Sequence, residues 1–276
     1  MPLNAGEFDY IRALVRARSA IVLEPDKLYL AEARLAPLAR TSGFRTLNDL
    51  VAHLRAVPEN RLHQQVVEKM ATTETSFFRD LHPFEVLRRD VLPLLLRNRS
   101  TTRALNIWCG ACSSGQEPYS VALLLREHFP ELRSWTVRIL ASDLSAEMLE
   151  RAQRGRYTQM EVNRGLPARL LVKHFHKVGN DWQVSDELRG MVEFSRFNLL
   201  DAWPAFPPID VCYVRNVLIY FDVESRKQIL AKVRRILRAD GYLFLGGAET
   251  TLHLDDAFER VQFDLAGCYR LVNKGS

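Results

Sequence analysis

The chain has 276 residues, of which 47% are hydrophobic, and its 38 Lys and Arg against 33 Asp and Glu give a net charge of +5. This length can hold one large domain or two smaller ones with hydrophobic cores. No apolar run approaches the roughly 18–20 residues that span a bilayer, the N-terminus lacks the apolar stretch of a secretory signal, and four cysteines are too few for a disulfide framework. We therefore expect a soluble cytoplasmic protein.

The first part of the chain, up to about residue 75, has the pattern of helices. Apolar residues recur at helical spacing in two segments: Phe8, Ile11, Leu14 and Val15 in the first, and Leu47, Leu50, Val51 and Leu54 in the second. Residues 40–46, RTSGFRT, read as a loop between such helices. An all-α N-terminal domain is therefore expected over residues 1–75.

From about residue 100, apolar strands alternate with helices. Strands are expected at 103–109, 136–143, 191–199, within 209–221, from 242 and in the tail 258–272, with helices at 118–129, 145–155 and 223–238. Ser145 is a suitable N-cap for the second of these helices. Such alternation indicates a mostly parallel sheet that is covered on both faces. We expect this α/β domain over 100–276, joined to the helical part by a linker at 76–99.

Residues 173–188, KHFHKVGNDWQVSDEL, do not fit the alternation. Two short extended runs flank Gly-Asn-Asp, which is the pattern of a β-hairpin. A small β-subdomain is therefore expected at about 173–193, inserted between a helix and the third strand.

The segment 106–120, NIWCGACSSGQEPYS, follows the first strand of the α/β domain and precedes its first helix. A structural zinc site needs four ligands, and the two cysteines outside Cys109 and Cys112 form no second pair. A redox pair requires cysteines at a helix N-terminus, whereas this helix is expected to begin later, near Pro118. A cofactor-binding loop fits best, because open α/β sheets bind nucleotides at this position.

The composition of this loop points to the kind of cofactor. Its small residues let a ligand approach the backbone: Gly110, Ala111, Ser113, Ser114 and Gly115. The pattern is not G-x-G-x-x-G, and no Lys follows Gly115 as in a phosphate-binding P-loop. A nucleoside without phosphates is favoured, of which S-adenosylmethionine is the common example. Asp143 ends the second strand, where an acid can accept hydrogen bonds from both ribose hydroxyls.

With these features together, the sequence resembles the CheR-type chemotaxis methyltransferases, which transfer a methyl group from S-adenosylmethionine to glutamate side chains of chemoreceptors. The resemblance covers nearly the whole chain and rests on five motifs in order: TTETSFFRD (72–80), WCGACSSGQEPYS (108–120), ASD (141–143), FNLLD (197–201) and VRNVLIYFD (214–222). The family fold is a Rossmann-like methyltransferase domain with a mostly parallel seven-stranded sheet, an all-α N-terminal domain and a small inserted β-subdomain.

The resemblance implies a role for each matching position. The segment that joins the helical part to the sheet should close over the cofactor with Thr73, Thr75 and Arg79. The strand ends should line the cofactor site with Glu117, Asp143, Asn198, Leu199, Arg215 and Asn216. Thr73 departs from the family, which usually has Asn there and so has more polar atoms at this position. Arg79 and Tyr220 are the candidate catalytic residues, and Tyr220 should stand near the transferred methyl.

The implied chemistry needs no general base. A glutamate acceptor has a pKa of about 4.3 and is already ionised at neutral pH. Catalysis must then come mainly from holding oxygen, methyl and sulfur in line, which contributes up to roughly 7–11 kcal/mol in the best cases. Arg79 could orient the acceptor carboxylate, and Tyr220 could fix the sulfonium end with its hydroxyl or its ring face.

The implied partner is the cytoplasmic helical bundle of chemoreceptors, with regulatory proteins as further candidates, and the enzyme is expected to be a monomer without a metal, nucleic acid or membrane insertion. Basic residues could steer an acidic partner, among them Arg34, Arg40, Arg45 and the stretches 151–197 and 223–240. One alternative is a nucleic-acid or amine methyltransferase, although such enzymes often carry Pro-Pro-Tyr after the fourth strand, where this chain has Arg-Asn-Val-Leu-Ile-Tyr. A non-enzymatic S-adenosylmethionine sensor is the other, and turnover would discriminate it.

Overall fold

The computed structural model describes residues 2–272 and divides the chain into two compact units. The first runs to Thr72 and includes Tyr220–Ser225, and the second comprises Thr73–Ile219 and the chain from Arg226 onward. The last four residues of the α/β domain expected over 100–276 lie outside the described residues. Among the helices that the structure describes, none combines the length and the apolar character needed to cross a membrane.

The first unit is helical. Its elements are α1 (Ala5–Ser19), η1 (Pro25–Lys27), α2 (Leu28–Thr41), α3 (Leu47–Ala56) and α4 (Arg61–Met70). Three of these helices begin with a capping box, at Asn4, Thr46 and Asn60. In a capping box the side chain of the cap residue accepts a backbone N–H group of the first helical turn, and the side chain of the third helical residue accepts the backbone N–H group of the cap residue. The apolar stripes noted in the sequence are buried in α1 and α3. The expected all-α N-terminal domain is confirmed.

The second unit is built on a seven-stranded sheet in the order β6-β2-β1-β7-β8-β10-β9. Its strands are β1 (Ala104–Gly110), β2 (Thr136–Asp143), β6 (Val192–Arg196), β7 (Ile209–Val214), β8 (Leu237–Leu245), β9 (Phe258–Gln262) and β10 (Gly267–Leu271). The five strands from β6 to β8 are parallel, and β10 is antiparallel to both of its neighbours. All six residues of β7 are buried, as a central strand of a parallel sheet covered on both faces requires. The mostly parallel seven-stranded sheet is therefore confirmed.

The remaining helices follow the linker and the strands, and some pack on the large sheet while others contact the small sheet described below. They are α5 (His82–Val86), η2 (Leu87–Val91), α6 (Leu92–Asn98), α7 (Gln116–His128), η3 (Pro130–Ser134), α8 (Ala146–Arg154), α9 (Gln159–Asn163), α10 (Ala168–His174), α11 (Asp186–Arg189), η4 (Leu218–Tyr220) and α12 (Val223–Ile236). Ser145 caps α8 through the Met148 amide, as its sequence suggests. Within the segment 76–99, treated above as a linker, residues 82–98 are helical, and Phe84 of α5 stacks on Tyr213 of β7 with ring centroids 5.7 Å apart.

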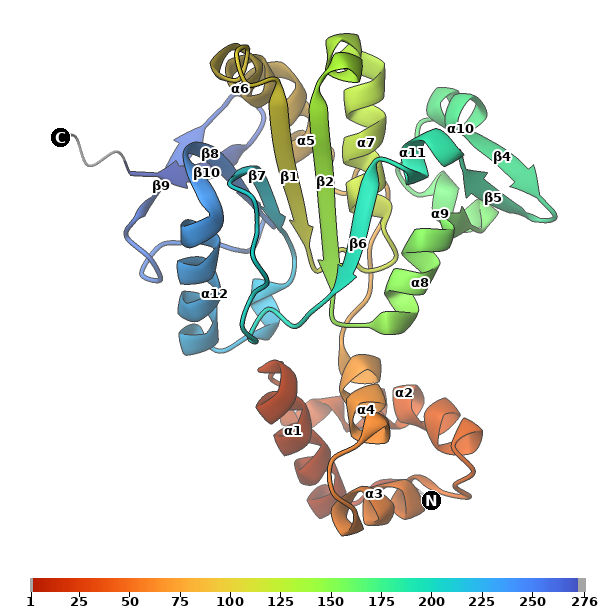
Figure 1. The fold of residues 1–276 in the computed structure, drawn as a ribbon. Helices are drawn as coiled ribbons and strands as arrows, with labels where there is room; N and C mark the ends of the chain where they lie inside the picture. The colour runs from red at the N-terminus through yellow and green to blue at the C-terminus, as the bar shows by residue number, and fades with distance from the viewer. Residues whose placement is uncertain (1, 273–276) are drawn as a thin grey trace. The chain divides into compact units, whose positions relative to one another are not determined.

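A second, antiparallel sheet forms the small β-subdomain. It contains β3 (Arg156–Tyr157), β5 (Asp181–Val184) and β4 (Phe175–Val178), in that order. The hairpin expected at 173–188 is confirmed as β4 and β5, and β3 adds a strand of only two residues, too short to leave a pattern in the sequence. Figure 1 shows this subdomain beside the β6 edge of the large sheet, with β9 at the opposite edge.

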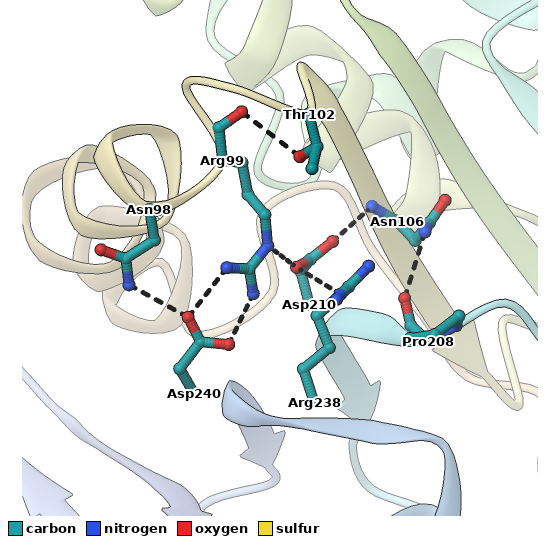
Figure 2. A network of polar contacts seen from close by, with 8 residues as sticks. All are labelled: Asn98, Arg99, Thr102, Asn106, Pro208, Asp210, Arg238 and Asp240. Atoms are coloured by element: carbon teal, nitrogen blue, oxygen red, sulfur yellow. Dashed lines mark hydrogen bonds and ion pairs between the residues drawn. The ribbon is translucent and has the colours of Figure 1, made fainter.

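A buried ionic network ties α6 to the N-terminal part of the large sheet (Figure 2). Arg99, which caps α6, donates from Nε to Asp210 (2.8 Å) and from Nη1 and Nη2 to Asp240 (2.9 and 2.5 Å). Asp210 is fully buried in β7, accepts the backbone N–H of Asn106 in β1 at 2.8 Å and lies 3.2 Å from Arg238 Nε in β8. One guanidinium thus joins a helix end to strands β7 and β8.

Candidate functional site

The C-terminal ends of β2, β1 and β7 meet at one edge of the large sheet. Gly110, at the end of β1, is paired with Ser142 on one side and Val214 on the other. The next residues along the two outer strands are Asp143 and Arg215. The predicted cofactor loop leaves β1 between them, so the topology brings together residues from three distant parts of the chain at the edge where open α/β sheets bind ligands.

The loop between β1 and α7 is tightly wound. Ala111, Ser113 and Gly115 have left-handed backbones, with φ of 57°, 50° and 93°. The Cys112 amide donates to the Ser142 carbonyl at 2.9 Å, which ties the loop to β2. A Cβ atom at position 115 would lie 2.8 Å from the Cβ of Ala152 in α8, so this turn requires glycine.

Asp143 is held in place by the loop that it faces. Its Oδ2 accepts the backbone N–H of Ser113 at 2.7 Å, and its Oδ1 accepts that of Ser145 at 2.8 Å. The Ser113 hydroxyl in turn donates to the carbonyl oxygen of Thr73 at 2.7 Å. Three predicted parts of the site, namely Thr73, the loop and Asp143, are thereby brought together through Ser113.

A second cluster forms around Arg215, whose side chain is only 1% exposed. Its Nη1 donates to Glu117 Oε2 at 2.9 Å, and its Nη2 donates to Asp80 Oδ2 at 2.7 Å and to the Arg79 carbonyl at 3.0 Å. The guanidinium also lies over the ring of Phe84, 5.7 Å from its centroid. Arg79, Glu117 and Arg215, all predicted site residues, therefore share one contact group.

The electrostatics of this cluster are unbalanced. Burial raises the pKa of Glu117, although the charge and hydrogen bond of Arg215, with a further contribution from Arg79, oppose the shift. Arg215 Nε is buried and has no hydrogen-bond acceptor among residues 2–272. A buried hydrogen-bond donor without an acceptor is destabilising unless a bound molecule supplies the acceptor. The Arg215 Nε donor is therefore a candidate ligand contact.

The segment that carries Arg79 is conformationally unusual. Phe78, Asp80 and Leu81 have left-handed backbones, with φ of 48°, 65° and 47°, which is uncommon for residues other than glycine. The Phe78 amide donates to Ser120 Oγ in α7 at 2.9 Å, which anchors the segment. Arg79 itself donates from Nη1 to the Glu74 carbonyl at 2.8 Å, so its guanidinium is turned back along its own segment. Thr75 lies between them, half-buried.

Three further predicted residues, Asn198, Leu199 and Tyr220, make hydrogen bonds of their own. Asn198 and Leu199 follow β6, where the Asn198 side chain accepts the Leu200 amide at 3.1 Å and the Leu199 carbonyl accepts Lys232 Nζ at 3.0 Å. Tyr220 ends η4 and belongs to the first unit, in which its carbonyl accepts the Val22 amide at 2.9 Å.

Three residues of the site were not predicted from the sequence. Ser113 links Thr73 to Asp143, Asp80 pairs with Arg215, and Glu249 accepts the Asn216 amide at 2.8 Å. Asp80 and Glu249 also line a cavity of about 700 Å³ that Arg215 borders. Ser113 was noted only as a small residue, and the long sequence separations of the other two contacts leave no local pattern.

The cysteine pair of the loop is not exposed to solvent. Cys109 and Cys112 are both buried, and burial raises the pKa of each thiol well above its ordinary value. Such thiols stay protonated at neutral pH and are poor nucleophiles. They are small packing residues of the core, Cys109 in β1 and Cys112 within the loop itself.

Comparisons with known proteins agree on one family. Residues 6–70 match the family described as "CheR methyltransferase, all-alpha domain", and residues 73–266 match "CheR methyltransferase, SAM binding domain". Chemotaxis protein methyltransferase Cher2 of Pseudomonas putida is 38% identical over 93% of this chain and 94% of its own length. Chemotaxis protein methyltransferase 1 of Pseudomonas aeruginosa is also 38% identical, over 96% and 97%. A chemotaxis protein methyltransferase of Vibrio parahaemolyticus is 36% identical over 98% of both chains.

Proposed function

The chain belongs to the CheR methyltransferase family, and from this premise we propose that it esterifies glutamate side chains of chemoreceptors. Family membership makes it an S-adenosylmethionine-dependent methyltransferase of chemotaxis. The glutamate acceptor and the role of each site residue go beyond membership and are argued below from the contacts at the strand ends.

The residues at the sheet edge fit S-adenosylmethionine. The loop 111–115, in which three residues have left-handed backbones, presents backbone rather than bulky side chains to a ligand. Asp143 is oriented by two amides, one on each carboxylate oxygen, and is suited to bind the ribose hydroxyls. Arg215 has a buried Nε without an acceptor, which suits a ligand that carries a carboxylate. We assign the binding role to these residues together with Thr73, Thr75, Glu117, Asn198, Leu199 and Asn216.

When bound, the cofactor supplies a methyl group on a positively charged sulfur. The chain's own residues then orient the two partners and exclude water. Glu117 brings a carboxylate into this buried region, where its Oε2 accepts a hydrogen bond from Arg215 Nη1 at 2.9 Å. Its charge contributes to the local electrostatic field while this ion pair stays intact. Arg79 contributes a guanidinium close enough to influence the Glu117 carboxylate, and we assign it the positioning of the acceptor carboxylate. Tyr220 is assigned to the methyl by the resemblance alone.

The observation that carries the glutamate acceptor is the state of the site's carboxylates. Glu117 and Asp80 are paired with Arg215, Asp143 accepts two amides, and Glu249 accepts backbone N–H groups. Each is engaged in holding the structure, whereas a general base must be able to take up a proton from the substrate. An ionised carboxylate acceptor needs no such base, but a protonated amine does.

Further parts of the proposal concern the setting in which the enzyme acts. The acceptor is the cytoplasmic helical bundle of a chemoreceptor, which the enzyme meets as a cytoplasmic monomer, and regulatory proteins are further partners. The excess of basic residues favours encounter with an acidic surface, an effect that falls with salt because charges are screened over about 10 Å at 0.1 M.

The chemical stability of the product tests the acceptor. The enzyme is incubated with methyl-labelled S-adenosylmethionine and membranes that carry chemoreceptors, and the pH is then raised. Mild alkali hydrolyses an ester and leaves an N–CH3 bond intact, so the label should leave as volatile methanol. Receptors whose candidate glutamates are replaced by alanine serve as the control and should take up no label. Label that survives alkali, or that enters RNA or DNA, would contradict the proposal.

A further inference from the structure

Glu249 occupies an unusual position just after β8. Its side chain is nearly buried, at 9% exposure of the residue, and it accepts backbone N–H groups on both oxygens. Oε1 accepts from Val217, Leu218 and Ile219 at 2.8, 2.6 and 3.3 Å. Oε2 accepts from Asn216 and Gly246 at 2.8 and 2.6 Å. One carboxylate thus satisfies five amides.

Four of these amides are consecutive in the chain. Residues 216–219 turn their N–H groups toward one point, with Asn216 in a left-handed conformation (φ 58°) and η4 beginning at Leu218. Converging backbone amides of this kind form a nest that attracts an anion. Here the anion is part of the protein, which reaches back from a residue some thirty positions further along the chain.

The space around the Glu249 carboxylate is closely packed. A Cβ atom at Gly246 would lie 2.7 Å from Glu249 Oε2, 2.7 Å from Asn216 Nδ2 and 2.8 Å from the Asn216 amide nitrogen. No side chain fits at position 246 unless this packing shifts. The β8 end, Glu249 and the loop after β7 therefore form one rigid contact.

The loop that Glu249 fixes is the one that carries the proposed site residues. Arg215 immediately precedes the four amides, Asn216 supplies the first of them, and Tyr220 follows the last. We propose that Glu249 is a positioning residue of the methyltransferase, whose carboxylate sets the backbone of 216–219 and through it the side chains of Arg215 and Asn216. This inference rests on the proposed function for the role of those side chains.

The negative charge of Glu249 is essential to this role. Hydrogen bonds to a charged group contribute more than neutral ones, and a buried N–H left unpaired is destabilising. A glutamine has nearly the same size, but its NH2 group is a donor and would face the amides that now bond one carboxylate oxygen. Glu249→Gln should therefore displace the loop without removing side-chain volume, and Glu249→Asp should keep the charge with a shorter reach.

The test compares three variants with the wild type. Calorimetry measures binding of S-adenosylhomocysteine, which needs no acceptor, and the methylation assay gives kcat at saturating cofactor. Glu249→Gln should weaken binding at least fivefold and lower kcat at least thirtyfold, while Glu249→Asp recovers part of both losses. Asp256→Asn is the matched control, because this exposed acid lines the same cavity and its loss should leave both values within twofold of the wild type.

Each outcome decides the matter. Thermal unfolding and circular dichroism give the folded fraction, so kcat is expressed per folded molecule. A folded Glu249→Gln protein with wild-type binding and kcat overturns the proposal, and so does an equal loss in Asp256→Asn. If Glu249→Gln does not fold, a folded Glu249→Asp protein with wild-type values overturns it, and failure of both to fold would make Glu249 a folding residue only. If the wild type forms no ester, the proposed function fails, but the binding comparison still tests Glu249.

Discussion

Two buried arginines lie at the two ends of the parallel strands, called here the N-terminal edge and the C-terminal edge of the sheet. Each arginine is paired with two acidic side chains. Arg99 contacts Asp210 and Asp240 at the N-terminal edge, and Arg215 contacts Glu117 and Asp80 at the C-terminal edge. Every guanidinium nitrogen of Arg99 donates to a carboxylate (Figure 2), whereas Arg215 Nε has no acceptor in the described part of the chain. The Arg99 network, in which every nitrogen of that guanidinium has an acceptor, is suited to stabilising the fold. The Arg215 network keeps one unsatisfied donor and is suited to binding a ligand.

The two networks also differ in how they treat their acids. The hydrogen bond from Arg99 lowers the pKa of Asp240, so ionisation of that acid is favoured by the fold. Burial raises the pKa of Glu117 in spite of Arg215, so ionisation there is disfavoured. An ionisable group whose burial disfavours its charged form, and so lowers the stability of the folded protein, is typical of functional sites. The comparison predicts that changes at the first edge affect folding and changes at the second affect activity.

Removing Arg99 should produce the largest effect. Arg99→Met removes one cationic partner of the fully buried Asp210 and the main cationic partner of Asp240. Breaking a buried ion pair in this way lowers the free energy of unfolding by roughly 3–5 kcal/mol. Urea unfolding measures the change, and kcat per folded molecule should stay within twofold of the wild type. A stable Arg99→Met protein with lowered kcat would reverse the assignment of the two edges.

Asp143→Ala should act at the other edge on binding. Its carboxylate is expected to bond both ribose hydroxyls, so its loss should weaken S-adenosylmethionine binding by roughly 2–4 kcal/mol. The loop amide of Ser113 also loses its acceptor, which adds to the effect. Calorimetry is the measurement. Unchanged affinity in a folded variant would remove Asp143 from the cofactor site.

Arg79→Ala separates positioning of the acceptor from binding of the cofactor. Arg79 is half-buried and its guanidinium donates to the carbonyl of the nearby Glu74, a contact to the protein's surface segment alone, so stability should change little. If Arg79 orients the acceptor in the transition state, kcat should fall by about 10–100-fold, or roughly 1.4–2.7 kcal/mol, with a smaller change in cofactor affinity. Equal losses in both quantities would reassign Arg79 to cofactor binding.

The pH dependence of stability should show the smallest effects, with opposite signs. Asp240 has a folded pKa below its unfolded value of about 3.9, so its contribution is complete above that pH and is lost as the pH falls through the lowered pKa. Glu117 has a folded pKa above its unfolded value of about 4.3, so its penalty is absent below that pH and develops as the pH rises through the raised pKa.

Unfolding in urea between pH 3 and 8 checks both signs. Asp240→Asn should flatten the acid side of the profile, by less than about 1 kcal/mol because the Asp240 side chain is 43% exposed. Glu117→Gln should remove the decline toward neutral pH. Profiles parallel to that of the wild type in both variants would contradict the electrostatic contrast between the edges.

The sequence predicts those features that are local. The end of β2 at Asp143 and the cap of α8 at Ser145 follow from strand and capping patterns a few residues long. The helices at 82–98 were not predicted because Pro83 and Pro93 interrupt the pattern and because η2 is a π-helix, whose i→i+5 hydrogen bonds shift the period. The contact of Arg215 with Asp80 joins residues 135 positions apart, and no local pattern reports a contact of that kind.

Calorimetric titration of S-adenosylmethionine into two matched variants tests most directly the claim that the incomplete edge is the cofactor site. Arg99→Lys and Arg215→Lys both keep a positive charge and lose the planar fork of donors. We expect Arg99→Lys to bind one cofactor per chain with wild-type affinity, although it unfolds at a lower urea concentration. Arg215→Lys should bind the cofactor at least tenfold more weakly, a loss of about 1.4 kcal/mol. Equal affinity in the two variants, or weaker binding in Arg99→Lys, would contradict it.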